Sequence, residues 1–154
     1  MKQYDPSNST QPHSGPPDDG SRLLHPGPRR ILVAEDDQEM RALLTQSLRW
    51  AGYRVTECVD GWDLLSHLGS YLIPQNHENI DLVISDIRMP GLTGLEILRG
   101  TRGTRRFPPV ILITAFGDDE THAEAARLGA AMLDKPFDMN EMLATVASTI
   151  SGAQ

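Results

Sequence analysis

Short apolar or β-branched runs alternate five times with segments of helical character, and this alternation limits the possible folds more than any other feature of the sequence. The runs have the length of strands and lie at 31–34, 54–58, 82–84, 110–113 and 130–133. Apolar residues at helical spacing, or an alanine-rich stretch, follow each run at 40–51, 64–68, 95–98, 118–128 and 139–150. Because parallel strands need crossover helices, the pattern predicts an α/β fold, a five-stranded parallel sheet with five helices on both faces.

The first 28 residues differ in composition from the rest of the chain. They contain six prolines and three glycines, and few large apolar side chains beyond Leu23 and Leu24. Such a segment buries too little surface to offset the entropy that it would lose on ordering. We therefore predict a disordered Pro/Gly/Ser-rich tail over residues 1–28 and one folded domain over residues 29–154.

The chain is acidic, with 21 Asp and Glu against 14 Lys and Arg, a formal net charge of −7. This charge disfavours direct binding to nucleic acid or to an anionic membrane. No stretch approaches the ~20 apolar residues that span a bilayer, and the N-terminus lacks the apolar run of a signal peptide. With a single cysteine and therefore no intramolecular disulfide, the sequence predicts a cytoplasmic protein.

Neither the cysteine nor the histidines show a recognisable metal-ligand spacing. We interpret Cys58 as a packed thiol, since it has no partner motif. The five histidines are interpreted as ordinary surface residues: His13, His25, His67, His77 and His122.

Polar residues follow four of the predicted strands at the point where each strand ends. Glu35 and Asp36 follow the first run, Asp86 the third, Thr114 the fourth and Lys135 the fifth. In open parallel sheets, sites form outside the carboxyl ends of the strands. If these four strands are neighbours, the five side chains converge at one edge of the sheet.

These residue types suit phosphoryl transfer to a carboxylate. Three carboxylates in close quarters repel one another unless a cation lies between them, and Mg²⁺ favours such oxygen ligands. Asp36 and Asp86 could bind Mg²⁺ directly, with Glu35 acting through water. A carboxylate can also be a nucleophile that forms an aspartyl phosphate. Lys135 would then neutralise one phosphoryl oxygen and Thr114 would donate a hydrogen bond to another.

Four segments in this order resemble the receiver domain of two-component response regulators. They read ILVAEDD (31–37), LVISDIRMPGLTGLEIL (82–98), VILITAFGD (110–118) and DKPF (134–137). The resemblance covers about residues 29–151 and implies a flavodoxin-like fold with strand order 2-1-3-4-5.

The resemblance also implies a role for each matching residue. It makes Asp86 the phosphoacceptor, Glu35 and Asp36 the acidic metal pair, Arg88 a metal ligand through its backbone carbonyl, Thr114 the switch hydroxyl and Lys135 the contact to the phosphoryl group. In the family the bond between the lysine and the following proline is cis, so a cis bond is expected between Lys135 and Pro136.

The function implied is that of a single-domain response regulator, because only 17 residues follow Phe137. Such a protein accepts a phosphoryl group from a sensor histidine kinase or a phosphotransfer protein. It acts on a downstream protein by contact, through the face of 118–128, 130–133 and 139–150, rather than on DNA. It catalyses only its own phosphorylation and dephosphorylation and is not otherwise an enzyme.

The sequence departs from the family pattern at two places. Met132 stands where the family commonly has an aromatic residue that changes rotamer with the hydroxyl, and the segment at 70–79 is longer than usual.

Two alternative functions remain open. One alternative is a binding module with the receiver fold that signals without phosphate. The other is an aspartyl-phosphate phosphatase of the haloacid dehalogenase type, which needs a second carboxylate where this chain has Arg88.

Overall fold

The computed structural model describes residues 27–73, 79–101, 103–104 and 107–153. The predicted tail at 1–28 lies outside these ranges except for its last two residues, and so do residues 74–78 of the segment at 70–79. Both predictions therefore stay predictions.

The described strands form one parallel sheet. They are β1 (Arg30–Ala34), β2 (Arg54–Cys58), β3 (Leu82–Asp86), β4 (Val110–Thr114) and β5 (Ala131–Asp134). Their order is β2-β1-β3-β4-β5, so the predicted fold class and strand order are confirmed. The register aligns the last residues of neighbouring strands, for example Ala34 with Cys58 and Thr114 with Asp134. The carboxyl ends of the strands consequently form one continuous edge.

A helix follows each strand. The five helices are α1 (Gln38–Trp50), α2 (Gly61–Tyr71), α3 (Gly94–Thr101), α4 (Asp119–Arg127) and α5 (Met139–Gly152). Four of them begin at an aspartate whose side chain accepts a hydrogen bond from an amide two or three residues further on: Asp37, Asp60, Asp118 and Asp138. This capping satisfies amides that have no partner within the helix. None of the helices in the described ranges is long and apolar enough to cross a bilayer.

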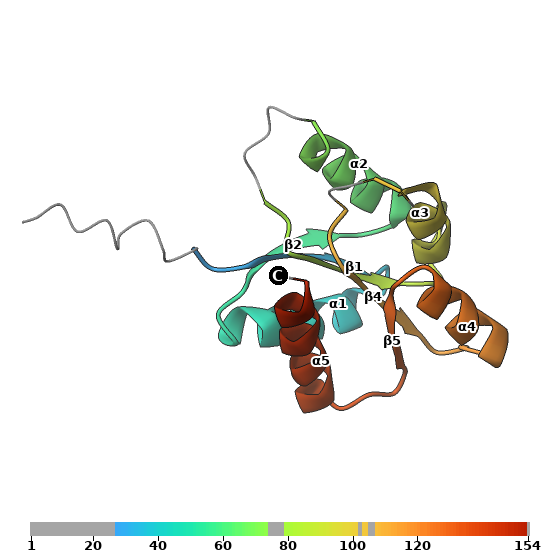
Figure 1. Ribbon diagram of the computed structural model, residues 1–154. Helices are drawn as coiled ribbons and strands as arrows, with labels where there is room; N and C mark the ends of the chain where they lie inside the picture. The colour runs from blue at the N-terminus through green and yellow to red at the C-terminus, as the bar shows by residue number, and fades with distance from the viewer. Residues whose placement is uncertain (1–26, 74–78, 102, 105–106, 154) are drawn as a thin grey trace, which may run out of the picture.

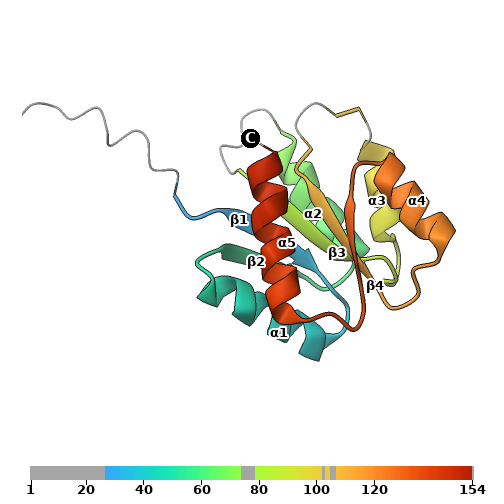
Figure 2. The same ribbon diagram turned by 60° about the horizontal axis from the view of Figure 1, so that its bottom comes forward.

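The helices cover both faces of the sheet. Figure 1 shows α1 and α5 on one side and α2 and α3 on the other, and Figure 2 shows α5 crossing in front of the strands. A hydrophobic core lies on each face of the sheet, and alternate residues of β1 pack into one core or the other, because successive strand residues point to opposite faces. Ile31 and Val33 pack with residues of α1 and α5, whereas Leu32 and Ala34 pack with residues of α2, α3 and α4.

Two leucines among the apolar residues at helical spacing are exposed rather than buried. Leu43 in α1 is 51% exposed and Leu65 in α2 is 37% exposed. The buried residues of α1 are Leu44, Thr45 and Leu48. Residues at i, i+1 and i+4 share one helical face, and position 43 lies a further 100° around the helix. Thr45 takes the inward position because its hydroxyl donates to the Ala42 carbonyl within the helix, at 3.2 Å.

The start of α2 lies directly against the loop that follows β3. A Cβ atom on Gly61 would overlap the carbonyl oxygen of Leu92. Only glycine permits this approach of two backbones without displacement. The contact holds the start of α2 against the loop after Asp86, which lies at the carboxyl edge of the sheet.

Candidate functional site

The predicted site residues all lie at the carboxyl edge of the sheet. Glu35 and Asp36 follow β1, Asp86 ends β3, Thr114 ends β4 and Lys135 follows β5. Asp37 caps α1 immediately after the acidic pair, by accepting from the Met40 amide at 2.7 Å. The turn between β1 and α1 is therefore held close to the end of its strand.

Three carboxylates meet at this edge. One oxygen each of Glu35, Asp36 and Asp86 lies within 4.8 Å of the others. Glu35 is 1% and Asp86 6% exposed, whereas Asp36 faces solvent. Backbone amides orient the buried pair: Asp37 donates to Glu35 Oε1 at 3.1 Å, and Arg88 donates to Asp86 Oδ1 at 2.9 Å. The group is thus buried on one side and open to solvent at Asp36.

The ammonium of Lys135 bridges the two buried carboxylates. Its Nζ donates to Asp86 Oδ2 at 2.6 Å and to Glu35 Oε2 at 2.9 Å. Burial on its own would lower the pKa of Lys135, but the hydrogen bonds and charges of Asp86 and Glu35 outweigh it and raise that pKa. The lysine is therefore charged. The Lys135–Pro136 bond is cis, as the resemblance implies.

Glu35 is the group whose protonation the site changes most. Burial raises its pKa to about 7, and the nearby charge of Asp86 acts in the same direction. The hydrogen bonds from Lys135 and from the Asp37 amide oppose this rise without cancelling it. Independently of this shift, the edge sets three carboxylates against one ammonium, an arrangement that favours the binding of a cation.

Thr114 and Arg88 lie beside the carboxylates. Thr114 is buried, and its Oγ1 accepts from the Phe116 amide at 3.1 Å. The Thr114 carbonyl accepts from the Lys135 amide at 2.7 Å, which ties the hydroxyl to the lysine through the backbone. The Arg88 guanidinium stacks over the Phe116 ring, 4.3 Å from its centroid. The predicted role of the Arg88 carbonyl as a metal ligand stays a prediction.

The donor set fits Mg²⁺. All three side chains offer carboxylate oxygens, the ligands that this ion prefers, and the open side at Asp36 leaves room for the waters that it keeps. No sulfur or nitrogen donor belongs to this group of three, so the chemistry of the group favours a hard cation.

Met132 occupies the position of the usual aromatic residue. It lies in β5 opposite Leu112 of β4, half-buried, and packs against the core on the α2, α3 and α4 face. A flexible thioether therefore fills this place.

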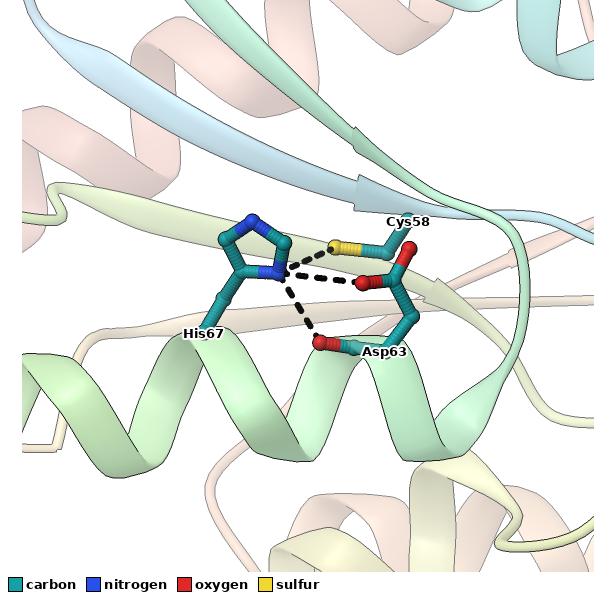
Figure 3. A group of neighbouring side chains, drawn as sticks. All are labelled: Cys58, Asp63 and His67. Atoms are coloured by element: carbon teal, nitrogen blue, oxygen red, sulfur yellow. Dashed lines mark hydrogen bonds and ion pairs between the residues drawn. The ribbon is translucent and has the colours of Figure 1, made fainter.

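Sequence reasoning missed a second cluster. Cys58, Asp63 and His67 come together at the end of β2 and the start of α2 (Figure 3). Asp63 and His67 are four residues apart on one helix, a spacing that places two side chains on the same face. This spacing was the signal available in the sequence, but nothing in it indicated that Cys58 points toward the same face.

Comparison with known proteins places the chain in a family. The family model described as the response regulator receiver domain matches residues 31–147. The DNA-binding transcriptional regulator NtrC of Escherichia coli (strain K12) is 35% identical over 125 residues, which are 80% of this chain and 25% of NtrC. The transcriptional regulatory protein FixJ of Bradyrhizobium diazoefficiens is 34% identical over 125 residues, 58% of its own length. The chain thus spans about a quarter of NtrC and somewhat over half of FixJ.

Solved structures agree. The receiver domain of the Francisella response regulator 1452 superposes with a TM-score of 0.69 at 27% identity, over 82% of this chain and 99% of that one. The chemotaxis protein CheY4 of Vibrio cholerae gives a TM-score of 0.69 at 27% identity, over 80% and 99%. The BeF3-activated DrrB receiver domain gives 0.67 at 29% identity, over 80% and 98%. With its parallel sheet, its carboxylate edge and these relatives, the chain belongs to the response regulator receiver domain family.

Proposed function

We propose that Asp86 accepts a phosphoryl group from a sensor histidine kinase or a phosphotransfer protein, in a Mg²⁺-dependent reaction, and that the phosphorylated chain signals by contact with a downstream protein. The observation that carries this proposal is the meeting of three carboxylates with the ammonium of Lys135, which lies 2.6 Å from Asp86.

The proposed transfer is a displacement at phosphorus. A carboxylate oxygen of Asp86 forms the new P–O bond while the P–N bond of a phosphohistidine breaks, and the electron pair stays on the imidazole nitrogen. Lys135 balances the charge that gathers on the phosphoryl oxygens, and Thr114 donates its hydroxyl proton to one of them. Bound Mg²⁺ supplies further charge neutralisation there. Water later cleaves the acyl phosphate and returns the carboxylate and inorganic phosphate.

Glu35, Asp36 and Asp86 are proposed to hold the metal ion, with the Arg88 carbonyl as a further ligand. Lys135 already contacts Asp86 and Glu35, so it needs only a small side-chain movement to meet a phosphoryl group on Asp86. The buried position of Asp86 excludes most solvent from the acceptor. That exclusion favours phosphoryl transfer from a docked donor over reaction with water.

The downstream partner is proposed to be a protein. NtrC and FixJ are transcriptional regulators by name, and this chain matches only part of each. The single-domain organisation and the expected absence of direct nucleic-acid binding stay predictions, and the proposed phosphoryl transfer depends on neither.

Two observations bear on the alternatives. The position two residues after Asp86 holds Arg88, which is exposed and stacks on Phe116, so it supplies no second carboxylate for a dehalogenase-type phosphatase. A module that signals without phosphate has no need for an ammonium held against a buried aspartate. The contact between Lys135 and Asp86 therefore favours phosphoryl transfer.

The test is phosphoryl uptake from labelled acetyl phosphate or a histidine kinase. We expect Mg²⁺-dependent labelling of the wild type and none of Asp86→Asn. Asp37→Asn is the matched control, because asparagine also caps a helix and the residue lies in the same turn as the acidic pair. Labelled Asp86→Asn, or labelling that persists in EDTA, contradicts the proposal. Beryllofluoride, with which the DrrB receiver domain was activated, provides a second readout, since a module without phosphate chemistry would not bind it.

A further inference from the structure

Three different ligand atoms meet at one ring nitrogen outside the carboxylate edge. Cys58 ends β2, and Asp63 and His67 lie one turn apart on α2 (Figure 3). His67 Nδ1 is 2.9 Å from the carbonyl oxygen of Asp63, 3.3 Å from its Oδ1 and 3.7 Å from Cys58 Sγ. Sulfur, nitrogen and carboxylate oxygen all lie within 4.8 Å of one another.

A single proton on the His67 ring nitrogen does not serve all three of these contacts. A carbonyl oxygen only accepts, so its contact with His67 assigns a proton to Nδ1 and uses the one donor which that nitrogen has. The Asp63 Oδ1 and Cys58 Sγ then face the same nitrogen without a further proton from it. A cysteine–histidine–aspartate catalytic relay is excluded as well, because such a relay uses both ring nitrogens and here one nitrogen meets both partners.

The spacing matches the edges of a tetrahedron around a metal ion. Metal–ligand distances of about 2.3 Å for sulfur and about 2.0–2.1 Å for nitrogen and oxygen give edges of about 3.3 Å between nitrogen and oxygen and about 3.6 Å between sulfur and nitrogen. The two distances observed are 3.3 Å and 3.7 Å. The third edge, between Cys58 Sγ and a carboxylate oxygen of Asp63, is at most 4.8 Å. An ion enters once the His67 ring turns Nδ1 away from the Asp63 carbonyl oxygen, 2.9 Å away.

Charge and access favour a cation. Cys58 is fully buried, while the side chains of Asp63 and His67 are 33% and 35% exposed and leave a path from solvent. Burial, and then the charges of Asp63 and Asp60, raise the pKa of Cys58 to about 12, so the free protein carries a thiol. The negative charges of Asp63 and Asp60 also attract a metal ion, which displaces the thiol proton against the cost of burial.

The carboxylate is held in position by the backbone. Asp63 Oδ2 accepts from the Val59 amide at 3.0 Å, which leaves Oδ1 directed at His67. The Asp63 amide in turn donates to Asp60 Oδ1 at 2.8 Å. The turn between Cys58 and Asp63 thus aims the oxygen before any ion arrives.

We propose that Cys58, Asp63 and His67 form a binding site for a divalent transition-metal ion of the zinc class, with water at the fourth position. On binding, the Cys58 thiol releases its proton to solvent, the imidazole proton passes through solvent from Nδ1 to Nε2, and three dative bonds form with no change of oxidation state. The mixed sulfur, nitrogen and oxygen donors distinguish this site from the all-oxygen group at Glu35, Asp36 and Asp86.

Co²⁺ is the probe that reads this site selectively. Cys58 is the only cysteine of the chain, so a thiolate-to-cobalt charge-transfer band can arise only there within one molecule. We expect the full-length wild type, with excess Mg²⁺ present, to develop this band with one Co²⁺ per chain and to lose it when Zn²⁺ is added. X-ray absorption of the Zn²⁺-loaded wild type should show one sulfur neighbour at about 2.3 Å.

Variants assign the ligands. Cys58→Ser should abolish the band, and His67→Gln and Asp63→Asn should each weaken Co²⁺ binding at least tenfold. His122→Gln is the control histidine, since it pairs with Asp134 far from this cluster, and Asp86→Asn controls for the carboxylate edge. Both should keep the band. The absence of a charge-transfer band and of a sulfur neighbour in the wild type would overturn the proposal whether or not any variant folds, and so would unchanged affinity in His67→Gln.

Discussion

Lys135 and Asp86 lie 49 residues apart in the chain, yet the ammonium of one is 2.6 Å from a carboxylate oxygen of the other. The same ammonium reaches Glu35, 100 residues away, at 2.9 Å. Lys135 is thus the internal countercharge of two carboxylates that the folded chain removes from water. In the proposed reaction its partner changes from carboxylate to phosphoryl oxygen, without a new charge having to be brought into the site.

Replacing Lys135 by Met should destabilise the protein in the absence of divalent ions. Two buried carboxylates would then face each other without their cation, and such a loss costs about 3 kcal/mol of unfolding free energy. Urea denaturation in EDTA measures the loss. Saturating Mg²⁺ should recover part of it, because an ion that binds only the folded state stabilises that state. An equal loss with and without Mg²⁺ would show that the lysine matters for packing rather than for charge.

Glu35 should make stability depend on pH. Burial raises its pKa from 4.5 to about 7, so between these values the folded chain holds a proton that the unfolded chain has lost. The free energy of unfolding contributed by this group therefore falls as pH rises through that window and is lowest above pH 7. The free energy of unfolding of Glu35→Gln should therefore rise relative to that of the wild type between pH 4.5 and pH 8. The rise in this difference should be on the order of 1–3 kcal/mol in EDTA. Parallel stability curves for the two proteins would contradict the assignment.

Asp36 should contribute to metal affinity without contributing to the fold. It is exposed, whereas the other two carboxylates of the group are buried. Asp36→Asn should weaken Mg²⁺ binding at least about tenfold, equivalent to roughly 1.4 kcal/mol, and leave the melting temperature in EDTA nearly unchanged. Isothermal titration with Mg²⁺ gives the affinity. Asp37→Asn, one residue further along, should bind Mg²⁺ like the wild type.

The Thr114 hydroxyl should release the Phe116 amide when the acceptor is loaded. In the free protein Oγ1 accepts from that amide, and a hydroxyl that turns toward a phosphoryl oxygen gives this bond up. We expect beryllofluoride with Mg²⁺ to speed hydrogen exchange at Phe116. In Thr114→Val the amide should exchange fast from the start, with no further change. The Ile87 amide, bonded to the Ile113 carbonyl in the sheet, serves as the internal reference.

Two glycines of the same helix should respond in opposite directions to alanine. A methyl group on Gly61 would overlap the Leu92 carbonyl, whereas nothing lies within 4 Å of the corresponding position on Gly69. Gly61→Ala should cost about 1–3 kcal/mol through forced backbone displacement. Gly69→Ala should gain about 0.5–1 kcal/mol, since alanine is the better helix former. Chemical denaturation of both variants checks this, and stabilisation in each would mean that the backbones can separate freely.

Much of the fold could be predicted because most strands are short apolar runs and most helices show apolar residues at helical spacing. The position of the carboxylate edge followed from the general behaviour of parallel sheets, and the structure brings Glu35, Asp36, Asp86 and Lys135 together there. Long-range contacts between backbones could not be predicted in this way. The backbones of Gly61 and Leu92 approach each other closely, but the apolar pattern of neither segment indicates that it contacts the other.

The second cluster shows the same limit. Asp63 and His67 are four residues apart, so the sequence alone places them on the same face of a helix. The direction of the Cys58 side chain depends instead on how β2 packs against α2. The exposure of Leu43 has a simpler cause. A pattern of apolar residues does not reveal that a threonine with an internal hydrogen-bond acceptor can take the buried position instead.

The span between Glu35 and Lys135 has a consequence for how the protein is assembled. The first and last strands must both be in place before these two residues can meet, so a partly formed sheet lacks the complete set of charges. A ligand that contacts the full set of charges therefore binds the finished fold and not a partly formed sheet, and its binding stabilises the complete molecule over incomplete ones.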